Sequence, residues 1–455
     1  MLCVTGLERA AGPLLSRVAA VASRLPGCIQ EVRLDALEDP PAEVLPSLSP
    51  WIGSLILAAR PVRQGGLWTG DEAARLDLLR AAIALGPFAA DVEADVDAAI
   101  PRGGATATRI VRSFHDFNGF PPDIAARATA LEAAGADVVK VAVRVDDPAD
   151  LARLLASRSP GRRVLIGMGA AGALSRVRYR AFGSPWTYVA ASSATASAPG
   201  QPSLDDAIDA GLPGSADRPF HALVGGPVVA RSPGPRVYGR LFRKRGIEAS
   251  PRPRETFDLL AALGAAGIAV TMPHKEAALA HGEPDAEAAR VGAANTLKVD
   301  GTRFLATNTD VAGVREPLAA VLGTRRGRAL VFGAGGAASA AIAACRDLGL
   351  DVVVAARKPV AGLESVPWDR RDRAAADVIV NATPDASWPF DAPPGAAVVF
   401  DLAMADGPSE LLSRARAAGA VVLGPHAMWV HQGAAQMTFL LGEPVSPAEL
   451  SELLA

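Results

Sequence analysis

RALVFGAGGAASAAIAACRDLGLDVVVAARK, residues 328–358, decides the fold of the second half of this 455-residue chain. An apolar run leads into a glycine turn, an alanine-rich segment of helical length follows, and a second apolar run closes the stretch. A strand, a glycine turn, a helix and a second strand in this order are the layout of a dinucleotide-binding unit. Gly333 and Gly335 permit the tight turn, and the helix that begins near Gly336 offers its first amides to phosphates.

The residues after this stretch indicate which dinucleotide is bound. Arg357 and Lys358 follow the second apolar run, whereas an acidic residue there would favour NAD through the ribose hydroxyls. Two cations favour a 2′-phosphate and therefore NADP, with NADPH as the reduced form; alternatively, Arg357 only covers the edge of the sheet.

Further apolar runs extend the sheet: DVIVNAT (377–383), AVVFDLA (397–403) and AVVLG (420–424). We therefore predict a Rossmann domain over residues 318–423 and a separate αβ unit over residues 220–317 ahead of it. The segment GLPGSADRP (211–219) is dense in Gly and Pro and marks a domain boundary.

The first half, residues 1–212, alternates eight short apolar runs with helix-length segments. The runs are LCVT (2–5), IQEVRL (29–34), SLILAAR (54–60), FAADVE (88–93), TRIVRSF (108–114), DVVKVAV (137–143), RVLIGMG (163–169) and WTYVAA (186–191). Eight strand–helix alternations predict a parallel (β/α)₈ TIM barrel. The fold class is therefore α/β throughout.

Composition excludes several classes of function. Charge is nearly balanced, with 46 Lys and Arg against 48 Asp and Glu, and no basic run offers a nucleic-acid footprint. Three cysteines without a CxxC pair argue against a disulfide framework or a zinc site and suit a reducing cytoplasm. The start MLCVTGLERA does not read as a signal peptide, and no segment reads as a membrane span. We expect a cytoplasmic protein that binds small molecules and holds no metal. The sequence does not determine the oligomeric state, and a homo-oligomer is one of the alternatives.

Lysine is scarce, since only 5 of the 46 basic residues are Lys and the other 41 are Arg. Coding bias explains such scarcity without any function, and a solvated surface is the ordinary place for a lysine. However, Lys140 and Lys275 lie in the apolar contexts VVKVAV and VTMPHKE, where an uncompensated ammonium is costly. These positions indicate a need for an amine that Arg cannot supply.

Five motifs of the first half, in order along the whole barrel, carry a family resemblance: EVRLD (31–35), HDF (115–117), VVKVAV (138–143), SR (175–176) and SAPGQPS (197–203). Together they resemble the type I 3-dehydroquinate dehydratases, a (β/α)₈ family. The resemblance implies that Lys140 forms a Schiff base and that His115 is the general acid–base. It also implies a set of substrate-binding residues: Glu31, Arg33, Arg60, Arg176, Ser197 and Gln201.

The residue types suit this chemistry. A Schiff base between a lysine and a ring ketone acidifies the neighbouring carbon, so that a base can remove its proton before water leaves. Desolvation in the apolar strand favours the neutral amine of Lys140; alternatively, it is a barrel-interior lysine held by a carboxylate. His115 follows a predicted strand at the catalytic face of the barrel, with a capping or packing role as its alternative. Gln64 stands where the family usually has Glu, and it can orient an imidazole but cannot stabilise its charged form.

Six motifs of the second half resemble the shikimate dehydrogenases: VTMPHKE (270–276), GAANTL (292–297), NTDVAG (308–313), GAGGAA (333–338), NAT (381–383) and MWVHQGA (428–434). The resemblance implies a catalytic pair, Lys275 and Asp310, that holds the substrate hydroxyl and relays its proton; a structural ion pair is the alternative. It also implies that residues 424–455 return to the substrate domain. Thr271, Asn295 and Gln432 are implied to bind hydroxyl groups, and each is alternatively a core hydrogen-bonding residue. The implied cofactor-binding residues are Gly333, Ala334, Gly335, Gly336, Ala337, Arg357, Lys358, Asn381 and Thr383.

Two departures from the shikimate dehydrogenase pattern leave the second substrate open. In GGPVVARSPGPRVYG (225–239) only Ser232 remains of a serine pair that binds the substrate carboxylate, with Arg231 as a replacement ligand and Tyr238 approximately aligned. Met404 stands where the family has a tyrosine.

The two resemblances together imply a bifunctional shikimate-pathway enzyme. It would convert 3-dehydroquinate to 3-dehydroshikimate and then, with NADPH, to shikimate. The alternatives are a dehydratase joined to a quinate or other polyol dehydrogenase, and a non-catalytic metabolite sensor. Retention of Lys140, His115, Lys275 and Asp310 together argues against the sensor.

Overall fold

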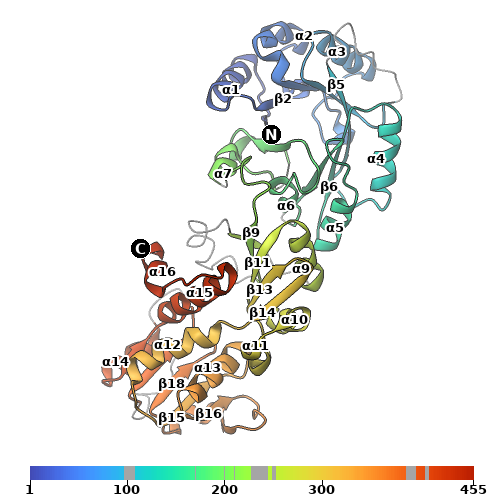
Figure 1. The fold of residues 1–455 in the computed structure, drawn as a ribbon. Coiled ribbons are helices and arrows are strands. Elements are labelled where there is room, and N and C mark those ends of the chain that lie inside the picture. The colour runs from blue at the N-terminus through green and yellow to red at the C-terminus, as the bar shows by residue number, and fades with distance from the viewer. Residues whose placement is uncertain are drawn as a thin grey trace. The chain divides into compact units, whose positions relative to one another are not determined.

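The computed structural model describes residues 1–96, 108–169, 171–198, 200–209, 211–226, 244–247, 253–385, 396–404 and 409–454. The chain forms two compact units. Unit 1 is Met1–Arg218 with Ala262–Gly264, and unit 2 is Pro219–Ala261 with Ala265–Ala455. In Figure 1, unit 1 runs from blue to green and unit 2 from green to red.

Unit 1 contains an eight-stranded parallel sheet in the order β7-β6-β5-β4-β3-β2-β1-β8, in which β1 pairs with both β2 and β8. The strands are β1 (Leu2–Thr5), β2 (Ile29–Arg33), β3 (Leu55–Ala58), β4 (Ala89–Glu93), β5 (Arg109–Asp116), β6 (Val138–Arg144), β7 (Arg163–Met168) and β8 (Thr187–Ala190). Each lies within one of the eight predicted runs or extends it by one or two residues, so the predicted barrel is confirmed. Parallel strands covered on both faces become apolar along their whole length, which makes them visible in sequence.

Helices connect these strands or, in the case of α7, follow the last one: α1 (Ala11–Arg24), α2 (Pro41–Val44), α3 (Glu72–Ala84), α4 (Ile124–Ala133), α5 (Pro148–Ala156), α6 (Ala173–Val177) and α7 (Leu204–Asp209). Outside the sheet, Leu14 of α1 and Leu79 of α3 belong to one apolar cluster with Val32 and Leu57. Because alternate side chains of a strand point to opposite faces, the residues between these positions face the barrel interior. The carboxyl-terminal part of that interior carries the charged residues described below.

The first sheet of unit 2 is mixed, in the order β10-β9-β11-β13-β14-β12. Its strands are β9 (Phe220–Val224), β10 (Lys244–Ile247), β11 (Ala265–Val270), β12 (Glu283–Pro284), β13 (Thr296–Asp300) and β14 (Arg303–Thr307). The helices of this part are α9 (Pro253–Ala262), α10 (Lys275–His281) and α11 (Ala286–Val291).

The second sheet of unit 2 is parallel, in the order β17-β16-β15-β18-β19-β20. Its strands are β15 (Arg328–Phe332), β16 (Asp351–Ala356), β17 (Glu364–Pro367), β18 (Val378–Asn381), β19 (Val398–Asp401) and β20 (Val421–Leu423). The strand order reverses between β15 and β18, which is where open α/β sheets bind ligands. The predicted Rossmann fold is therefore confirmed.

Four helices of unit 2 matter for its site: α12 (Asp310–Leu322), α13 (Gly336–Asp347), α14 (Glu410–Ala417) and α15 (Pro425–Leu441). Residues of α12 and α13 share one apolar cluster with β15 and β18, and Met428 of α15 packs against it. Further along α15, the Phe439 carbonyl accepts a hydrogen bond of 3.3 Å from Lys298 Nζ of β13. Helix α15 therefore touches both parts of unit 2, and the chain ends with α16 (Pro447–Leu454).

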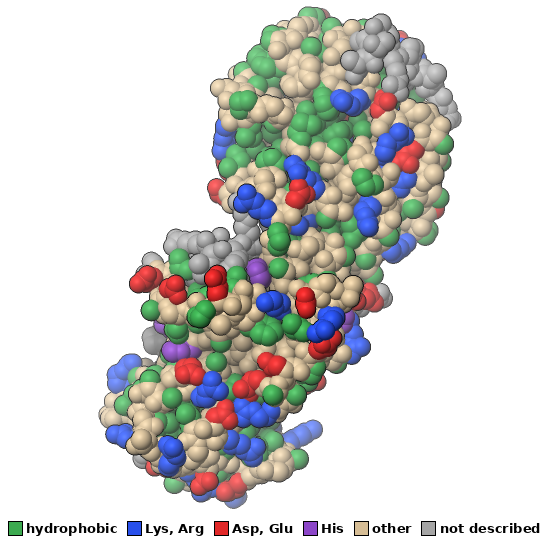
Figure 2. All heavy atoms as spheres, in the orientation of Figure 1, with side chains coloured by type: hydrophobic (Ala, Val, Ile, Leu, Met, Phe, Trp, Pro, Cys, Tyr) green, Lys and Arg blue, Asp and Glu red, His purple; other side chains and the backbone are tan. Residues whose placement is uncertain are grey.

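The surface carries charges of both signs. On the face drawn in Figure 2, Lys and Arg side chains lie interspersed with Asp and Glu. Among the helices of the described residues, none combines the length and apolar character needed to cross a membrane. Within the same residues, no three His, Cys, Asp or Glu side chains are grouped so that they could hold a metal ion.

Candidate active sites

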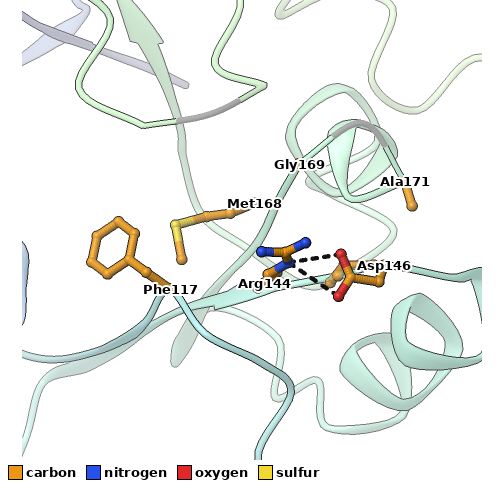
Figure 3. A pocket seen from close by; sticks show the side chains of 7 residues that line it. Phe117, Arg144, Asp146, Met168, Gly169 and Ala171 are labelled. Carbon is orange, nitrogen blue, oxygen red and sulfur yellow. Dashed lines mark hydrogen bonds and ion pairs between the residues drawn. The ribbon is translucent and has the colours of Figure 1, made fainter.

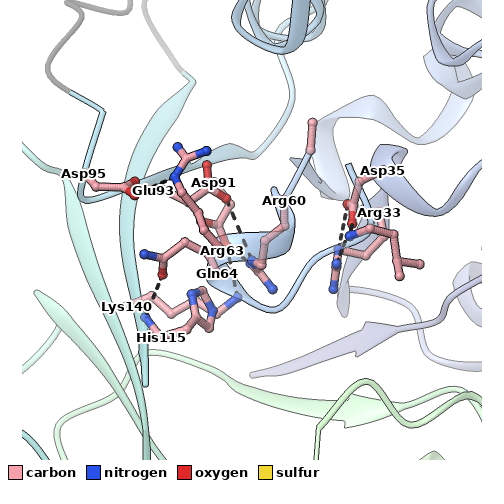
Figure 4. Close-up of polar contacts among 12 residues, drawn as sticks. Arg33, Asp35, Arg60, Arg63, Gln64, Asp91, Glu93, Asp95, His115 and Lys140 are labelled. Atoms are coloured by element: carbon pink, nitrogen blue, oxygen red, sulfur yellow. Dashed lines mark hydrogen bonds and ion pairs between the residues drawn. The ribbon is translucent and has the colours of Figure 1, made fainter. Parts of the chain in front are cut away.

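Unit 1 contains a cavity of about 40 Å³, here called the barrel cavity. All eight residues predicted for a site in the first half line it: Glu31, Arg33, Arg60, His115, Lys140, Arg176, Ser197 and Gln201. They lie on β2, β5 and β6, or follow β3, β7 and β8, because the carboxyl ends of parallel barrel strands meet at one face. Figure 4 shows several of these side chains gathered at that face.

The amine of Lys140 lies between two carboxylates. Its Nζ is 3.1 Å from Glu31 Oε1 and 3.0 Å from Asp91 Oδ2, and it lies 4.2 Å from the centre of the Tyr188 ring. Only 4% of the lysine side chain is exposed. The amine is thus held by carboxylates, the alternative that the sequence left open, and apolar atoms alone do not surround it.

Burial and neighbouring cations act in opposite directions on these two carboxylates. Burial raises their pKa, but the Lys140 ammonium and the Arg60 guanidinium outweigh burial and lower the pKa of Glu31 and of Asp91 to about 2. Arg60 donates to Asp91 Oδ2 at 2.8 Å. Both carboxylates are therefore ionised at neutral pH and stabilise positive charge on the lysine nitrogen.

His115 presents an imidazole with free nitrogens. Nδ1 and Nε2 are both shielded from solvent, and neither has a hydrogen-bond partner among the described residues. Burial, with the charges of Arg60 and Lys140, lowers the pKa of His115 well below its usual value. The ring is therefore neutral at pH 7 and able to accept a proton.

Gln64 contacts the backbone of His115 and leaves the ring nitrogens free. Its Oε1 accepts the His115 backbone N–H at 3.1 Å. Gln64 therefore ties the loop after β3 to β5, which differs from the expected role of orienting the imidazole.

Arg176 is a buried cation without an acidic partner among the described residues. Its side chain makes one long hydrogen bond, 3.4 Å from Nη1 to the Tyr188 carbonyl, and Nε has no partner in the described structure. Burial lowers the pKa of Arg176 to about 10. An unpaired guanidinium that lines a cavity indicates a site for an anion supplied by a ligand.

The other cavity residues are held by short contacts. Arg33 donates from Nε and Nη2 to the two oxygens of Asp35, at 2.8 and 2.6 Å. The Ser197 hydroxyl donates to Gln201 Oε1 at 3.0 Å. Such pairs fix the orientation of side chains before a ligand arrives.

A wider hollow of about 400 Å³ adjoins the barrel cavity, because Phe117 and Met168 line both. Figure 3 shows Arg144 in this hollow, where its Nε donates to both carboxylate oxygens of Asp146. The barrel cavity alone is small for a ring substrate, and this hollow is the adjoining space.

Three residues of this site were missed from the sequence: Asp91, Glu93 and Tyr188. Asp91 and Glu93 are fully buried on β4, and Glu93 forms an ion pair with Arg75 of α3. The signal for the two carboxylates was present in FAADVE (88–93), since a strand buried on both faces tolerates a carboxylate only beside a cation.

Unit 2 places the predicted pair together. Lys275 Nζ lies 2.5 Å from Asp310 Oδ2, with 15% of the lysine side chain and 6% of the aspartate side chain exposed. Asn295 Nδ2 donates to Asp310 Oδ1 at 2.8 Å. Gln432 Nε2 donates to the Thr309 hydroxyl at 2.8 Å, so it belongs to the same cluster. Thr271 follows β11, and its backbone N–H donates to the Val224 carbonyl.

The glycine turn lies beside this pair. Gly333 has a φ of +104°, which favours glycine, and a Cβ there would approach Thr383 Cγ2 to 3.1 Å. A Cβ on Gly336 would lie 3.7 Å from Lys275 Cδ, so the start of α13 adjoins the Lys–Asp pair. Ala334 and Gly335 are exposed, Ala337 is half-buried in the first turn of α13, and the amides of that turn suit a phosphate.

The remaining predicted positions are near the same edge of the sheet or outside the description. Asn381 accepts from the Thr383 hydroxyl at 2.7 Å and donates to Asp401 at 2.9 Å. Arg357 and Lys358 follow β16 and are exposed, and Met404 is 60% exposed. Ser232, with Arg231 and Tyr238, lies outside the described residues.

Comparisons with known proteins cover both units. The family model "Type I 3-dehydroquinase" matches residues 15–210, and "Shikimate dehydrogenase substrate binding domain" matches residues 223–297. The chloroplastic bifunctional 3-dehydroquinate dehydratase/shikimate dehydrogenase of Arabidopsis thaliana is 30% identical, covering 92% of this chain and 78% of that protein. A shikimate dehydrogenase (NADP(+)) of Anaeromyxobacter dehalogenans is 36% identical over 52% of this chain and 95% of its own length. A 3-dehydroquinate dehydratase of Pyrobaculum aerophilum is 37% identical over 38% of this chain and 60% of its own length.

Proposed function

Because this chain belongs to the bifunctional 3-dehydroquinate dehydratase/shikimate dehydrogenase family, we propose that the barrel cavity and the Lys275–Asp310 site carry its two reactions. The chain is a lyase and an NADP-dependent oxidoreductase of the shikimate pathway, and its substrates are small molecules. We assign residues 1–212 to the dehydratase, 318–423 to cofactor binding, and 220–317 with 424–455 to the dehydrogenase substrate. We also place the enzyme in the cytoplasm.

In the dehydratase, Lys140 is the nucleophile. Its ammonium gives up a proton to the neutral His115 ring of the same cavity, and the free amine attacks the ketone carbon of 3-dehydroquinate. The imidazolium then protonates the hydroxyl of the adduct and becomes neutral again. Loss of the carbonyl oxygen as water leaves an iminium whose positive charge the Glu31 and Asp91 carboxylates stabilise. The observation that carries this proposal is a buried amine in the same cavity as an imidazole with two free nitrogens.

His115 is the general base and then the general acid. The neutral ring removes a proton from the carbon next to the iminium, and the resulting imidazolium returns a proton to the departing hydroxyl, which leaves as water. Hydrolysis of the iminium then releases 3-dehydroshikimate and restores Lys140. Arg176 binds the substrate carboxylate, which neutralises its buried charge.

In the dehydrogenase, Lys275 and Asp310 hold the substrate hydroxyl and relay its proton. When bound, NADP supplies hydride transfer at the carbon that carries this hydroxyl. The turn from Gly333 to Ala337 fits its pyrophosphate, because Gly333 has a positive φ and the residues that lead into α13 are exposed or half-buried. Thr383 lies beside Gly333 and its hydroxyl donates to Asn381, and the exposed pair Arg357 and Lys358 suits a 2′-phosphate. Thr271, Asn295 and Gln432 orient the ring hydroxyls, and Ser232 is the proposed carboxylate ligand.

A borohydride trap tests the dehydratase assignment. Reduction in the presence of 3-dehydroquinate should leave a ligand adduct on Lys140, located by mass spectrometry of peptides. Lys140→Arg keeps the charge without the nucleophile, so dehydration should stop while dehydrogenase turnover continues. An active protein with no adduct at Lys140 would contradict the Schiff base.

Separate variants test the dehydrogenase pair. Lys275→Ala or Asp310→Ala should lower shikimate turnover by about 10² to 10⁴-fold, the span for a lost acid–base group. NADP⁺ affinity should change little, and dehydration in the same preparation serves as the control. Near-normal turnover in either variant would remove that residue from the proton relay.

A further inference from the structure

The orientation of the Asn295 side chain is determined by its neighbours. Its Oδ1 accepts the backbone N–H of Thr309 at 3.0 Å, so this atom must be the amide oxygen. The amide nitrogen then faces Asp310 Oδ1 at 2.8 Å and the Thr309 hydroxyl at 3.0 Å. Asn295 therefore holds one oxygen of the Asp310 carboxylate while Lys275 holds the other.

Two residues without an assigned role continue this chain of hydrogen bonds. The Thr296 hydroxyl donates to Asn295 Oδ1 at 2.9 Å, and Gln436 Nε2 donates to the Thr296 hydroxyl oxygen at 2.7 Å. Gln436 Nε2 also lies 3.4 Å from the Asn295 carbonyl. Because the Thr296 hydroxyl oxygen accepts a hydrogen bond from Gln436, its proton is donated to Asn295 Oδ1.

We propose that Gln436 and Thr296 are positioning residues of the dehydrogenase, which set the orientation of Asn295 and thereby aim the Asp310 carboxylate at Lys275. Thr296 is fully buried and Gln436 is 3% exposed, so water does not replace either contact. The inference rests on the proposed role of Lys275 and Asp310.

Helix α15 connects this series of hydrogen bonds to Gln432, a residue proposed to bind substrate. Gln432 and Gln436 are four residues apart on α15 and therefore lie on one face of the helix. Gln432 donates to the Thr309 hydroxyl, and Gln436 reaches Asn295 through Thr296. One helix thus positions both ends of the polar cluster around Asp310.

Two near-isosteric variants of the full chain test the proposal. Thr296→Val removes the hydroxyl, and Gln436→Met removes the amide while keeping its length. Each should lower kcat for shikimate oxidation about tenfold or more and leave KM for shikimate within about threefold. The reason is that the orientation of the Asp310 carboxylate is lost while the contacts that bind shikimate remain. The double variant should be no slower than the slower single variant, since the two residues act in one series of hydrogen bonds. Thr296→Ser keeps the hydroxyl and should retain kcat.

Controls separate positioning from folding. Thr438→Val removes a hydroxyl from the same helix that accepts only the Val445 backbone N–H in the described contacts, and it should retain kcat. NADP⁺ binding, measured by titration calorimetry, should be unchanged in every variant.

Three outcomes would overturn the inference: normal kcat in both single variants, additive losses in the double variant, or loss of NADP⁺ binding, which would indicate a structural role. Turnover of Lys275→Ala distinguishes a failure of the proposed function from a failure of the positioning role alone. Normal turnover there contradicts the proposed function, whereas an inactive Lys275→Ala beside normal Thr296→Val and Gln436→Met contradicts only the positioning role.

Discussion

Replacing Arg176 by methionine should stabilise the dehydratase unit and at the same time weaken its substrate binding. Arg176 is 2% exposed, and burial lowers the pKa of its guanidinium to about 10, roughly 2.5 below its ordinary value. The side chain is protonated in both folded and unfolded chains at pH 7, so this difference is a cost of folding. At 1.36 kcal/mol for each pKa unit, the cost is about 3 kcal/mol. Methionine fills similar space without the charge, and the cost disappears.

The effect on substrate has the opposite sign. A charge-assisted hydrogen bond contributes about 1.5–3 kcal/mol, so losing the guanidinium should raise KM for 3-dehydroquinate about 10- to 100-fold. Calorimetric unfolding measures the stability change, and the dehydratase transition of the parent chain is the one that 3-dehydroshikimate raises and NADP⁺ leaves unchanged. In Arg176→Met this transition should start about 6 to 12 °C higher and respond little to the ligand.

Arg163→Met is the matched control, because Arg163 is also a buried arginine but its charge is paired. It donates to both carboxylate oxygens of Glu132 at 2.8 Å and to the Ser157 carbonyl at 2.6 Å. This variant should unfold at lower temperature, since it leaves Glu132 without its partner. If the unfolding temperature of Arg176→Met also falls, or if KM for 3-dehydroquinate does not change, then Arg176 is not a guanidinium that lacks a partner until a ligand anion binds.

Three other predictions follow from the two sites. Because the pKa of His115 lies well below 6.5, kcat/KM for dehydration should stay constant from pH 8 to 6.5 and fall only in more acidic solution; a midpoint at 6.5 or above would contradict a neutral imidazole base. Asp91→Asn removes a buried carboxylate that accepts hydrogen bonds from both Lys140 and Arg60. The free energy of unfolding of the dehydratase unit, measured by calorimetry, should therefore fall by about 3–5 kcal/mol, and an unchanged value would refute the pairing. Arg357→Ala should weaken NADPH binding about tenfold in titration calorimetry and leave NADH unaffected, and equal losses would argue against 2′-phosphate recognition.

Features that depend on neighbouring residues were predictable from the sequence alone. The eight strands of unit 1 appear as apolar runs because both faces of a parallel barrel are covered. The glycine turn at Gly333 is visible because its conformation is a local property of the chain. Lys140, His115 and Lys275 stood out for the same reason, since each polar side chain interrupts a local apolar pattern or follows a strand.

Features that depend on distant residues were decided by the tertiary structure. Lys140 meets Asp91, 49 positions away, and Glu31, 109 positions away, only because strand register and barrel order bring β2, β4 and β6 to one level of the interior. Thr296 and Gln436 are separated by 140 positions and meet because α15 packs back onto β13. Local chain geometry determines periodicity and turns, but it does not record which inward-facing side chains become neighbours. That choice is made when strands pair and helices pack, so the contacts of both sites could not be read from the sequence.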